Sequence, residues 1–265
     1  MKTKGKTKKV VFAMAVVLIA ALTSGAVVSA GGGLSMPLLY ATDDAQKGEV
    51  YISHTGVADS KKYKKQFKKA KWVIVYKKTE KSKKFKRFKK VKRDQVISDK
   101  KLKGLVQYKF QPVTKKGKKG KKTNAFSIFA LRSTGKYQTK DAEKGTIISF
   151  KIKNTSTKYK MTLSTRKDTD AYVDGDEIKK PYITNNSGTK KVKKFVVKKG
   201  KTATVNIMFP GLKLEEGKRI RGFSVGVFNL KAGKKVFVCD FEVPSDEKKP
   251  YTSSWNEKEL IKLYK

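Results

Sequence analysis

The segment GTIISFKIKNTS, residues 145–156, decides the fold class of this chain, because apolar and polar side chains alternate along it. Ile148, Phe150 and Ile152 share one side of an extended backbone, and Lys151 lies on the other. An amphipathic helix would instead place its apolar residues three and four positions apart. The segment therefore predicts a strand with one buried face, which stabilises the fold by about 1.5–3 kcal/mol for each large side chain that it buries.

Further segments of the same kind follow one another from residue 105 to residue 243. Each is short, carries β-branched or aromatic residues, and is separated from the next by turn-forming residues such as Gly, Asn, Asp or Ser. The predicted strands are 105–113, 125–132, 146–153, 160–165, 194–198, 202–209, 222–230 and 235–243. This succession predicts an all-β fold, and we expect residues 105–243 to form a β-sandwich domain.

Lysine dominates the composition. The 265 residues have a formal net charge of +43, and 59 of them are lysine whereas six are arginine. The strands explain part of this excess, because an outward-facing lysine keeps its ammonium group in water. Arginine, whose planar fork suits paired contacts with bases, is scarce, and no zinc finger, P-loop or RNA-binding signature is present. We therefore expect no intracellular nucleic-acid partner.

The excess is concentrated in residues 61–122, the basic segment, which holds 28 Lys or Arg residues and three acids. Apolar residues are spaced through it, so we expect it to be part of the sandwich or packed on it. Residues 72–76 (WVIVY) predict a buried strand. Apolar spacings of three and four predict two short helical elements, carried by Tyr63, Phe67 and Ala70 and by Phe85, Phe88 and Val91.

The run KKGKKGKK, residues 115–122, has no apolar side chain and predicts an exposed loop. A dense cluster of ammonium groups attracts polyanions. The candidate polyanion-binding residues are Lys115, Lys116, Lys118, Lys119, Lys121 and Lys122. Teichoic acid, acidic polysaccharide and extracellular DNA are polymers of the required charge.

The first thirty residues predict a secretory signal peptide. Five lysines precede an apolar run of about 13 residues. The segment closes at Val28, Ser29 and Ala30, with small residues at the two positions that a signal peptidase reads. A membrane anchor is the alternative, but a helix that spans a bilayer needs about 20 apolar residues. We expect cleavage after Ala30, a secreted protein associated with a bacterial cell surface or wall, and no membrane span in the mature chain. Residues 31–60 are expected to form an irregular leader and a first strand.

The C-terminal residues 244–265 are predicted to leave the sandwich as a helical tail. Ser254 and Glu257 have the spacing of a capping box, and apolar residues follow them. Cys239 is the only cysteine, so no disulfide can form within the chain. Its place in an alternating strand predicts a buried thiol; an intermolecular disulfide or a reactive thiol is the alternative.

Three pieces of the sandwich region resemble a known family. They are residues 145–156, residues 195–214 (FVVKKGKTATVNIMFPGLKL) and residues 218–243 (KRIRGFSVGVFNLKAGKKVFVCDFEV). Over about residues 105–243 the chain resembles galactose-binding-like jelly-roll domains of the carbohydrate-binding-module type. The resemblance implies a jelly-roll β-sandwich that binds carbohydrate or a cell-envelope glycan, on a concave sheet face or in edge loops.

The same resemblance implies two kinds of site. Aromatic platforms and polar groups would hold the glycan, and the candidates are Tyr172, Tyr182, Arg166, Asn206 and Arg221. Core or edge packing is the alternative role for the two tyrosines. A structural calcium ion would lie near the first and last strands, and its candidate ligands are Asp240 and Glu242, with Asp43 or Glu49. Compensation of nearby lysines is the alternative role for these acids.

Catalysis is not expected. His54 is the only histidine, acids are few, and the strand pattern buries Cys239, so neither a Ser-His-Asp arrangement nor a carboxylate pair in a cleft is indicated. Two compatible functions remain. One is a secreted glycan-binding module, and the other is electrostatic attachment to an anionic polymer. A structural surface protein without a small ligand is the third hypothesis.

Overall fold

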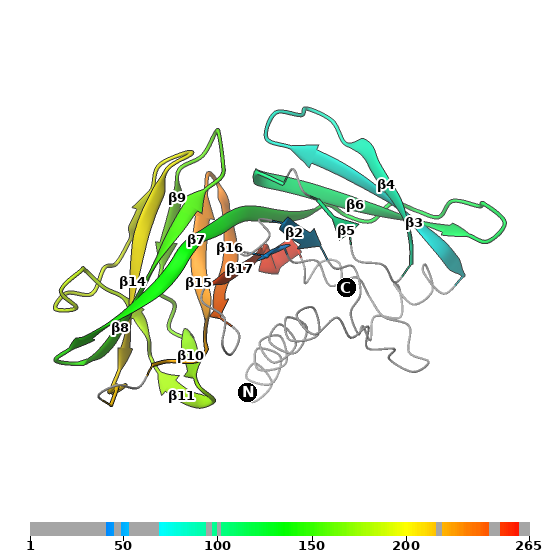
Figure 1. The fold of residues 1–265 in the computed structure, drawn as a ribbon. Coiled ribbons are helices and arrows are strands. Elements are labelled where there is room, and N and C mark those ends of the chain that lie inside the picture. Colours follow the sequence, from blue (N-terminus) through cyan, green and yellow to red (C-terminus); the bar gives the residue numbers. More distant parts are fainter. Residues whose placement is uncertain are drawn as a thin grey trace, which may run out of the picture. The chain divides into compact units, whose positions relative to one another are not determined.

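The structure is a computed structural model of the full chain. It describes residues 41–44, 49–52, 69–93, 97–99, 102–215, 219–243 and 250–259. These residues form two large antiparallel sheets that pack together (Figure 1), which confirms the predicted all-β sandwich. The predicted signal peptide, His54, and Tyr63 and Phe67 of the first predicted helix lie outside the described residues. No helix in the described ranges is long and apolar enough to cross a membrane.

The first sheet has ten strands. Its main path runs through β11 (Asp176–Lys179), β10 (Asp170–Val173), β15 (Phe223–Ala232), β16 (Lys235–Val243), β17 (Tyr251–Trp255), β1 (Ala41–Asp44), β2 (Glu49–Ile52) and β5 (Ile97–Ser98). Two further strands extend it beside β15, namely β9 (Met161–Ser164) and β13 (Phe195–Val197).

The second sheet has seven strands. Its order is β12 (Tyr182–Ile183), β14 (Thr202–Pro210), β8 (Gly145–Asn154), β7 (Phe126–Ala142), β6 (Gly104–Thr114), β3 (Ala70–Thr79) and β4 (Lys86–Lys92). Each of the eight strands predicted between residues 105 and 243 corresponds to one observed strand, and the predicted strand at 72–76 is the centre of β3.

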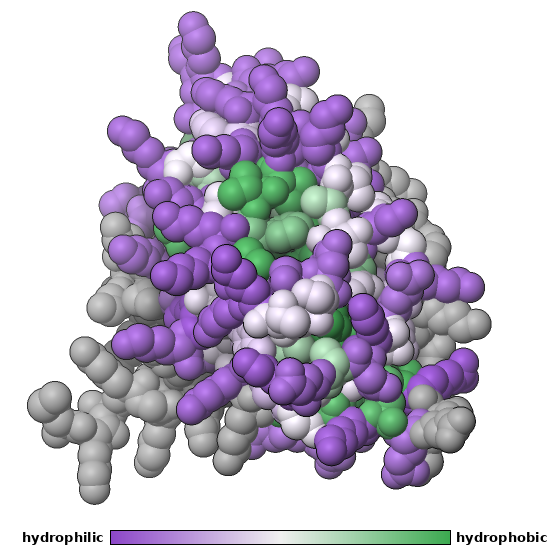
Figure 2. All heavy atoms as spheres, turned by 90° about the vertical axis from the view of Figure 1, so that its left-hand side faces the viewer, coloured by the Kyte–Doolittle hydropathy of each residue, from purple (hydrophilic) through white to green (hydrophobic). Residues whose placement is uncertain are grey.

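The core lies where β7, β8 and β14 face the first sheet. Ile148, Phe150 and Ile152 of β8 are buried in it, as their alternation predicts. The Phe150 ring meets the edge of the Phe241 ring from β16 at a centroid distance of 5.0 Å. Edge-to-face pairs of this kind add about 0.5–1.5 kcal/mol to the burial of the rings themselves. Figure 2 shows hydrophilic side chains projecting outward over this end of the molecule.

Strand β7 belongs to both halves of the second sheet. Its first residues, up to Ala130, pair with β6, and the residues from Leu131 onward pair with β8 on the other side. At this change of partner, hydroxyl groups of β17 bond the β7 backbone: Ser254 donates to the Phe129 carbonyl at 2.5 Å, and Thr252 donates to the Leu131 carbonyl at 2.7 Å. Buried carbonyl groups without a partner are costly, so these hydroxyls stabilise the crossover.

Beyond the crossover, β3, β4, β6 and the loop 115–122 form a unit that we call the basic wing (Figure 1). Its inner face is apolar and closed from solvent: Val75, Val106, Tyr108 and Phe110 are all fully buried. Its outer face carries Trp72, Tyr76 and many lysines. The alternation of period two along β3 and β6 produces this separation.

The structure corrects one predicted helical element and the beginning of the predicted C-terminal tail. Residues 86–92 form β4, so the predicted helical turn through Phe85, Phe88 and Val91 is wrong. The cause is a β-bulge: the register between β3 and β4 shifts between Val75 and Tyr76, where Phe88 has no cross-strand partner. An extra residue in a strand lengthens the apolar spacing from two to three, which imitates a helical pattern.

The beginning of the predicted C-terminal tail is the second correction. Residues 251–255 form β17, which lies inside the first sheet between β16 and β1. Ser254 bonds β7 and therefore does not cap a helix. The cap belongs to Asn256, whose side-chain oxygen accepts from the Glu259 amide at 2.9 Å at the start of a short helical turn. Residues 260–265 lie outside the described part of the chain.

Candidate functional site

The outer face of the basic wing brings together aromatic rings and ammonium groups from three strands. Cross-strand pairing places Tyr76 beside Lys109 of β6 and beside Arg87 of β4, and it places Ile74 beside Lys90. Paired residues in an antiparallel sheet share a face. We call this surface the basic–aromatic face, and its members are Trp72, Tyr76, Lys78, Phe85, Arg87, Lys90, Lys109 and Lys122.

Each aromatic ring on this face lies under lysine ammonium groups. The Lys90 Nζ lies 5.0 Å from the centroid of the Trp72 ring, and the Lys109 Nζ lies 4.9 Å from that of Phe85. The shortest contact, 4.1 Å, joins Lys122 Nζ to the Tyr76 ring. All three rings are half-buried. Cation–π contacts at such exposed sites are worth about 0.5–1 kcal/mol each, so the ammonium groups can leave the rings at low cost.

The lysine loop 115–122 is exposed throughout, as predicted. It is nonetheless held in a defined conformation. The Gly120 amide donates to the Pro112 carbonyl at 2.8 Å, and the Lys118 amide donates to the hydroxyl of Thr114 at 3.1 Å. The loop is joined to the basic–aromatic face because the Gln111 side chain donates to the Gly120 carbonyl at 2.8 Å and accepts from the Tyr76 hydroxyl.

The two described acids of the basic segment are occupied by structural contacts. Glu80 accepts from the Leu105 amide at 2.7 Å and from the hydroxyl of Ser156 at 2.6 Å, and so ties the wing to the turn after β8. A Cβ atom at Gly104, where φ is +58°, would collide with the Glu80 carboxylate, so this approach requires glycine. Glu80 is therefore committed to the contact between the wing and this turn.

Asp99 lies on the inner side of the wing and is almost fully buried. It forms an ion pair with Lys77 and accepts from the Tyr108 hydroxyl at 2.6 Å. Burial, followed by the charge of Asp99, raises the pKa of Tyr108 well above its ordinary value. Asp99 thus anchors the inner face and does not offset the charge of the outer one.

The five predicted glycan-binding residues are spread over both sheets. Tyr172 is 37% exposed on β10, beside Glu177 of β11, and burial together with the acids Asp170 and Glu177 raises its pKa. Tyr182 lies on β12 in the other sheet, with the Lys191 ammonium 5.4 Å from its ring centroid.

Arg166 and Asn206 are engaged within the fold. The guanidinium of Arg166 pairs with Asp168 at 2.9 Å and with Glu257 at 3.5 Å. Asn206 is 7% exposed, and its amide accepts from Ser149 at 2.7 Å and donates to Asn186. Asn206 lies on the face of β14 opposite the core residues Val205 and Ile207, where the segment that contains Asn186 covers it.

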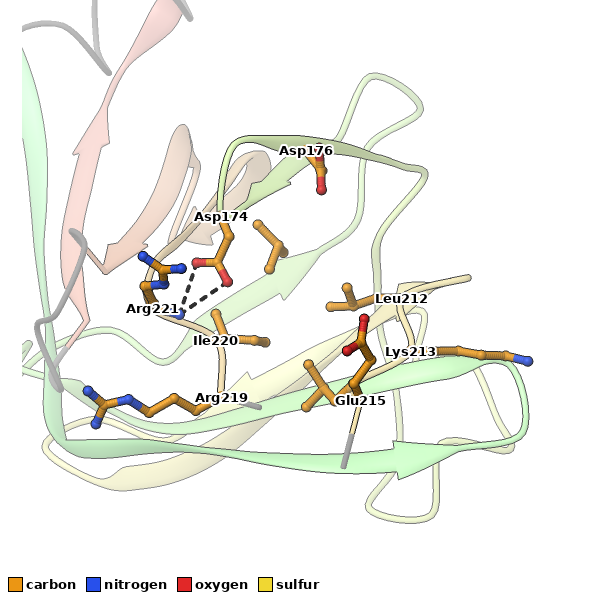
Figure 3. A pocket seen from close by; sticks show the side chains of 10 residues that line it. Asp174, Asp176, Leu212, Lys213, Glu215, Arg219, Ile220 and Arg221 are labelled. Carbon is orange, nitrogen blue, oxygen red and sulfur yellow. Dashed lines mark hydrogen bonds between the residues drawn. The ribbon is translucent and has the colours of Figure 1, made fainter. Parts of the chain in front are cut away.

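Arg221, the fifth predicted residue, lines a pocket of about 500 Å³ at one end of the sandwich (Figure 3). Leu212, Ile220 and Val173 supply apolar walls. The Asp174 carboxylate also lines the pocket. It accepts a hydrogen bond from the Arg221 backbone amide at 2.9 Å, which holds the two segments of the lining together. Lys213 and Arg219 point outward on opposite sides of the pocket (Figure 3). The pocket can hold a small polar ligand against an apolar wall.

The predicted calcium ligands Asp240 and Glu242 lie on the side of β16 that faces away from the core. Burial, followed by the charge of Asp240, raises the pKa of Glu242 to about 7. No group of three or more potential metal ligands occurs in the described ranges. The side chains of Asp43 and Glu49 lie outside that description. Cys239 is fully buried, and burial raises its thiol pKa well above the ordinary value.

Comparisons with known proteins return nothing: no protein-family model, no curated protein and no solved structure matches the chain. Of the surfaces described above, the basic–aromatic face was not foreseen from the sequence, because its members come together only through the pairing of β3 with β4 and β6.

Proposed function

We propose that this protein is a non-catalytic binding protein that attaches to anionic polymers through the basic–aromatic face and the lysine loop. The observation that carries the proposal is the gathering of Lys78, Arg87, Lys90, Lys109 and Lys122 on one side of the wing, beside a loop with five further lysines. The acids Glu80 and Asp99 are held in structural contacts elsewhere in the wing.

The spacing of the cations suits a linear polyanion. Neighbouring strands lie about 4.8 Å apart, and side chains on one face of a strand repeat about every 6.8 Å. A polymer with a charge on every unit can therefore meet several ammonium groups at once. Each neutralised phosphate releases a counterion, so the affinity is expected to fall steeply as salt rises.

The predicted export of the chain determines which polymers it would meet. Outside a bacterial cell these include wall teichoic acid, acidic polysaccharide and extracellular DNA. Lysine rather than arginine supplies the charge, so we expect binding to depend on the charge density of the polymer and little on its sequence.

The loop offers a direct test with a matched control. Replacing Lys115, Lys116, Lys118 and Lys119 by Gln is compared with replacing Lys193, Lys194, Lys198 and Lys199 by Gln, since all eight are exposed and both variants lose four charges. Binding to long-chain polyphosphate is measured between ~50 and ~200 mM salt. We expect the loop variant to reduce the salt slope by about three to four, and the control variant to change it by less than one. Equal losses in both variants would contradict a localised site.

A second candidate function rests on the pocket beside Arg221. The jelly-roll resemblance implies glycan binding in edge loops, and this pocket has an apolar wall and charged rim groups in such a place. The test is a glycan array of the wild type and of Arg221→Ala. Binding of a glycan that Arg221→Ala weakens, while polyphosphate binding stays unchanged, would support a separate glycan site. No bound glycan in the wild type would refute it.

A further inference from the structure

The aromatic rings of the basic–aromatic face have no role in simple charge attraction. Lysines alone would attract a polyanion, and a half-buried tryptophan on an exposed sheet face does not increase this electrostatic attraction. Trp72, Tyr76 and Phe85 nevertheless occupy this face, each under at least one ammonium group. Their presence indicates that the ligand brings a flat or apolar part as well as a charge.

We propose that the basic–aromatic face binds single-stranded nucleic acid, with bases stacking on the aromatic rings and phosphates meeting the lysines that cover those rings in the free protein. This inference rests on the proposed function and specifies its ligand. Aromatic platforms within a positively charged groove bind single strands with little sequence preference, because every base has a π-face.

Binding of this kind requires each ammonium group to leave its ring for a phosphate, so that a base can take its place on the ring. The Nζ atoms of Lys90 and Lys109 lie 5.0 Å and 4.9 Å from the centroids of the Trp72 and Phe85 rings. A lysine side chain reaches a phosphate by rotating about its own bonds, and this movement uncovers the ring. A stacked base contributes more than an exposed cation–π contact, so the exchange favours the complex.

The spacing of the rings also suits a single strand. Trp72 and Tyr76 lie four residues apart on β3, which corresponds to about 13 Å along the strand. Phe85 directly precedes β4 and continues the face, because Lys78 of β3 and Lys109 of β6 lie over its ring. Bases of one extended strand can therefore stack on the rings of both Trp72 and Tyr76, with the lysines between them facing the phosphates.

The polar groups of the face favour a nucleic acid over an acidic polysaccharide. Sugar recognition requires side chains that can bond several hydroxyl groups. Among the described residues the side-chain amides of this face are those of Gln107 and Gln111, which are already bonded to Ser127 and to Tyr76 and Gly120 respectively. On the described part of the face, the lysine ammonium groups, the Arg87 guanidinium and the ring faces remain, and these match phosphates and bases.

The chain contains a direct spectroscopic probe of this contact. Trp72 and Trp255 are its only tryptophans, and Trp255 is 6% exposed on β17 in the first sheet. Stacking of a base on Trp72 should quench its fluorescence. The protein is titrated with an oligothymidylate of about 20 nucleotides, with an abasic strand of equal phosphate number, with long-chain polyphosphate and with polygalacturonate.

We expect all the phosphate polymers to bind and only the oligothymidylate to quench the fluorescence. Trp72→Phe should remove the quenching, and Tyr76→Leu should weaken oligothymidylate binding about tenfold while leaving polyphosphate affinity within about twofold. Tyr172→Leu, which removes an exposed tyrosine from the other sheet, serves as the control. Circular dichroism of each variant verifies that the fold is retained.

The outcomes separate this inference from the function on which it rests. Equal affinity for the abasic strand and the oligothymidylate, without quenching, would overturn the stacking inference and leave polyanion attachment intact. Quenching by polygalacturonate as strong as that by oligothymidylate would overturn the choice of nucleic acid. If none of the polyanions binds, the proposed function itself fails.

Discussion

The sandwich and the basic wing use lysine in different ways. In β8 of the sandwich, Lys151 and Lys153 are exposed on the face opposite the buried Ile152, so they are the solvent side of an alternating strand. In the wing, lysines also cover aromatic rings: of nine ammonium–ring contacts within the described ranges, seven lie in the wing. The same residue type therefore solubilises one region and forms a candidate binding surface in the other.

The two regions also differ in how they are stabilised. The sandwich has a core shared by two sheets, in which rings such as Phe150, Phe223 and Phe241 contact one another. The wing has one sheet with a buried inner face, and polar contacts at Glu80 and Asp99 help to fix its position. We expect changes in the first region to lower global stability and changes in the second to act locally.

The largest effect is expected from the sandwich core. Phe150→Ala removes a ring that is 2% exposed and contacts Phe223 and Phe241. The lost burial and the cavity together should lower the free energy of unfolding by about 3–5 kcal/mol. Urea denaturation measures this, with the exposed Val196→Ala as the control. A loss below about 1 kcal/mol would show that the two sheets do not share a tight core at this point.

A smaller effect is expected from Glu242, a half-buried acid of the sandwich. Burial and Asp240 raise the pKa of Glu242 to about 7, above its value in the unfolded chain. The folded state therefore binds a proton that the unfolded state releases between about pH 4.5 and 7, and stability falls as the pH rises through this window. The contribution lost by pH 8 is up to about 3 kcal/mol.

Glu242→Gln should remove this pH dependence, because glutamine stays neutral. We expect the variant to match the wild type near pH 4.5 and to be more stable than it at pH 8, as measured by urea denaturation across the pH range. Glu143→Gln removes an exposed acid from the turn between β7 and β8 and should leave the wild-type profile unchanged. If both variants behave alike, the environment of Glu242 is not the cause of the pH dependence of stability.

The next effect should be confined to the wing. Glu80→Ala removes the acceptor of the Leu105 amide and of the hydroxyl of Ser156. Hydrogen bonds to a charged group are worth about 1.5–3 kcal/mol, and we expect a loss near the lower end because Glu80 is only half-buried. Hydrogen exchange should accelerate in β3 and β6 and stay unchanged in β14. Glu143→Ala, at an exposed position, is the control; acceleration in all strands would contradict local coupling.

The sequence predicted the sandwich more fully than the wing, and the reason is physical. Strands such as β8 and β14 bury one face, so a period of two is visible in their residues. Strand β11 has the sequence DEIK and β12 has two residues, so neither contains enough of a pattern to be recognised. These strands form because neighbouring strands supply their hydrogen bonds, which is long-range information.

The candidate site divides in the same way. The lysine loop was predicted because a run without apolar residues needs no tertiary context. The basic–aromatic face was not, since the bulge at Phe88 imitated a helical spacing in β4 and concealed the strand that completes the face. Ser254 shows the same limit: its capping-box spacing is present, but its hydroxyl is used by β7.

The smallest effect on stability, and the sharpest contrast between the regions, is expected from pairs of lysines. Lys151→Gln with Lys153→Gln removes two charges from the outer face of β8, and Lys90→Gln with Lys122→Gln removes two from the basic–aromatic face. All four side chains are exposed, so each pair should change the free energy of unfolding by no more than about 0.5–1 kcal/mol. Polyphosphate affinity should fall severalfold at ~50 mM salt for the wing pair and hardly at all for the sandwich pair, because counterion release requires a lysine at the contact. Equal falls would mean that net charge, and not the arrangement of the wing, determines the attraction.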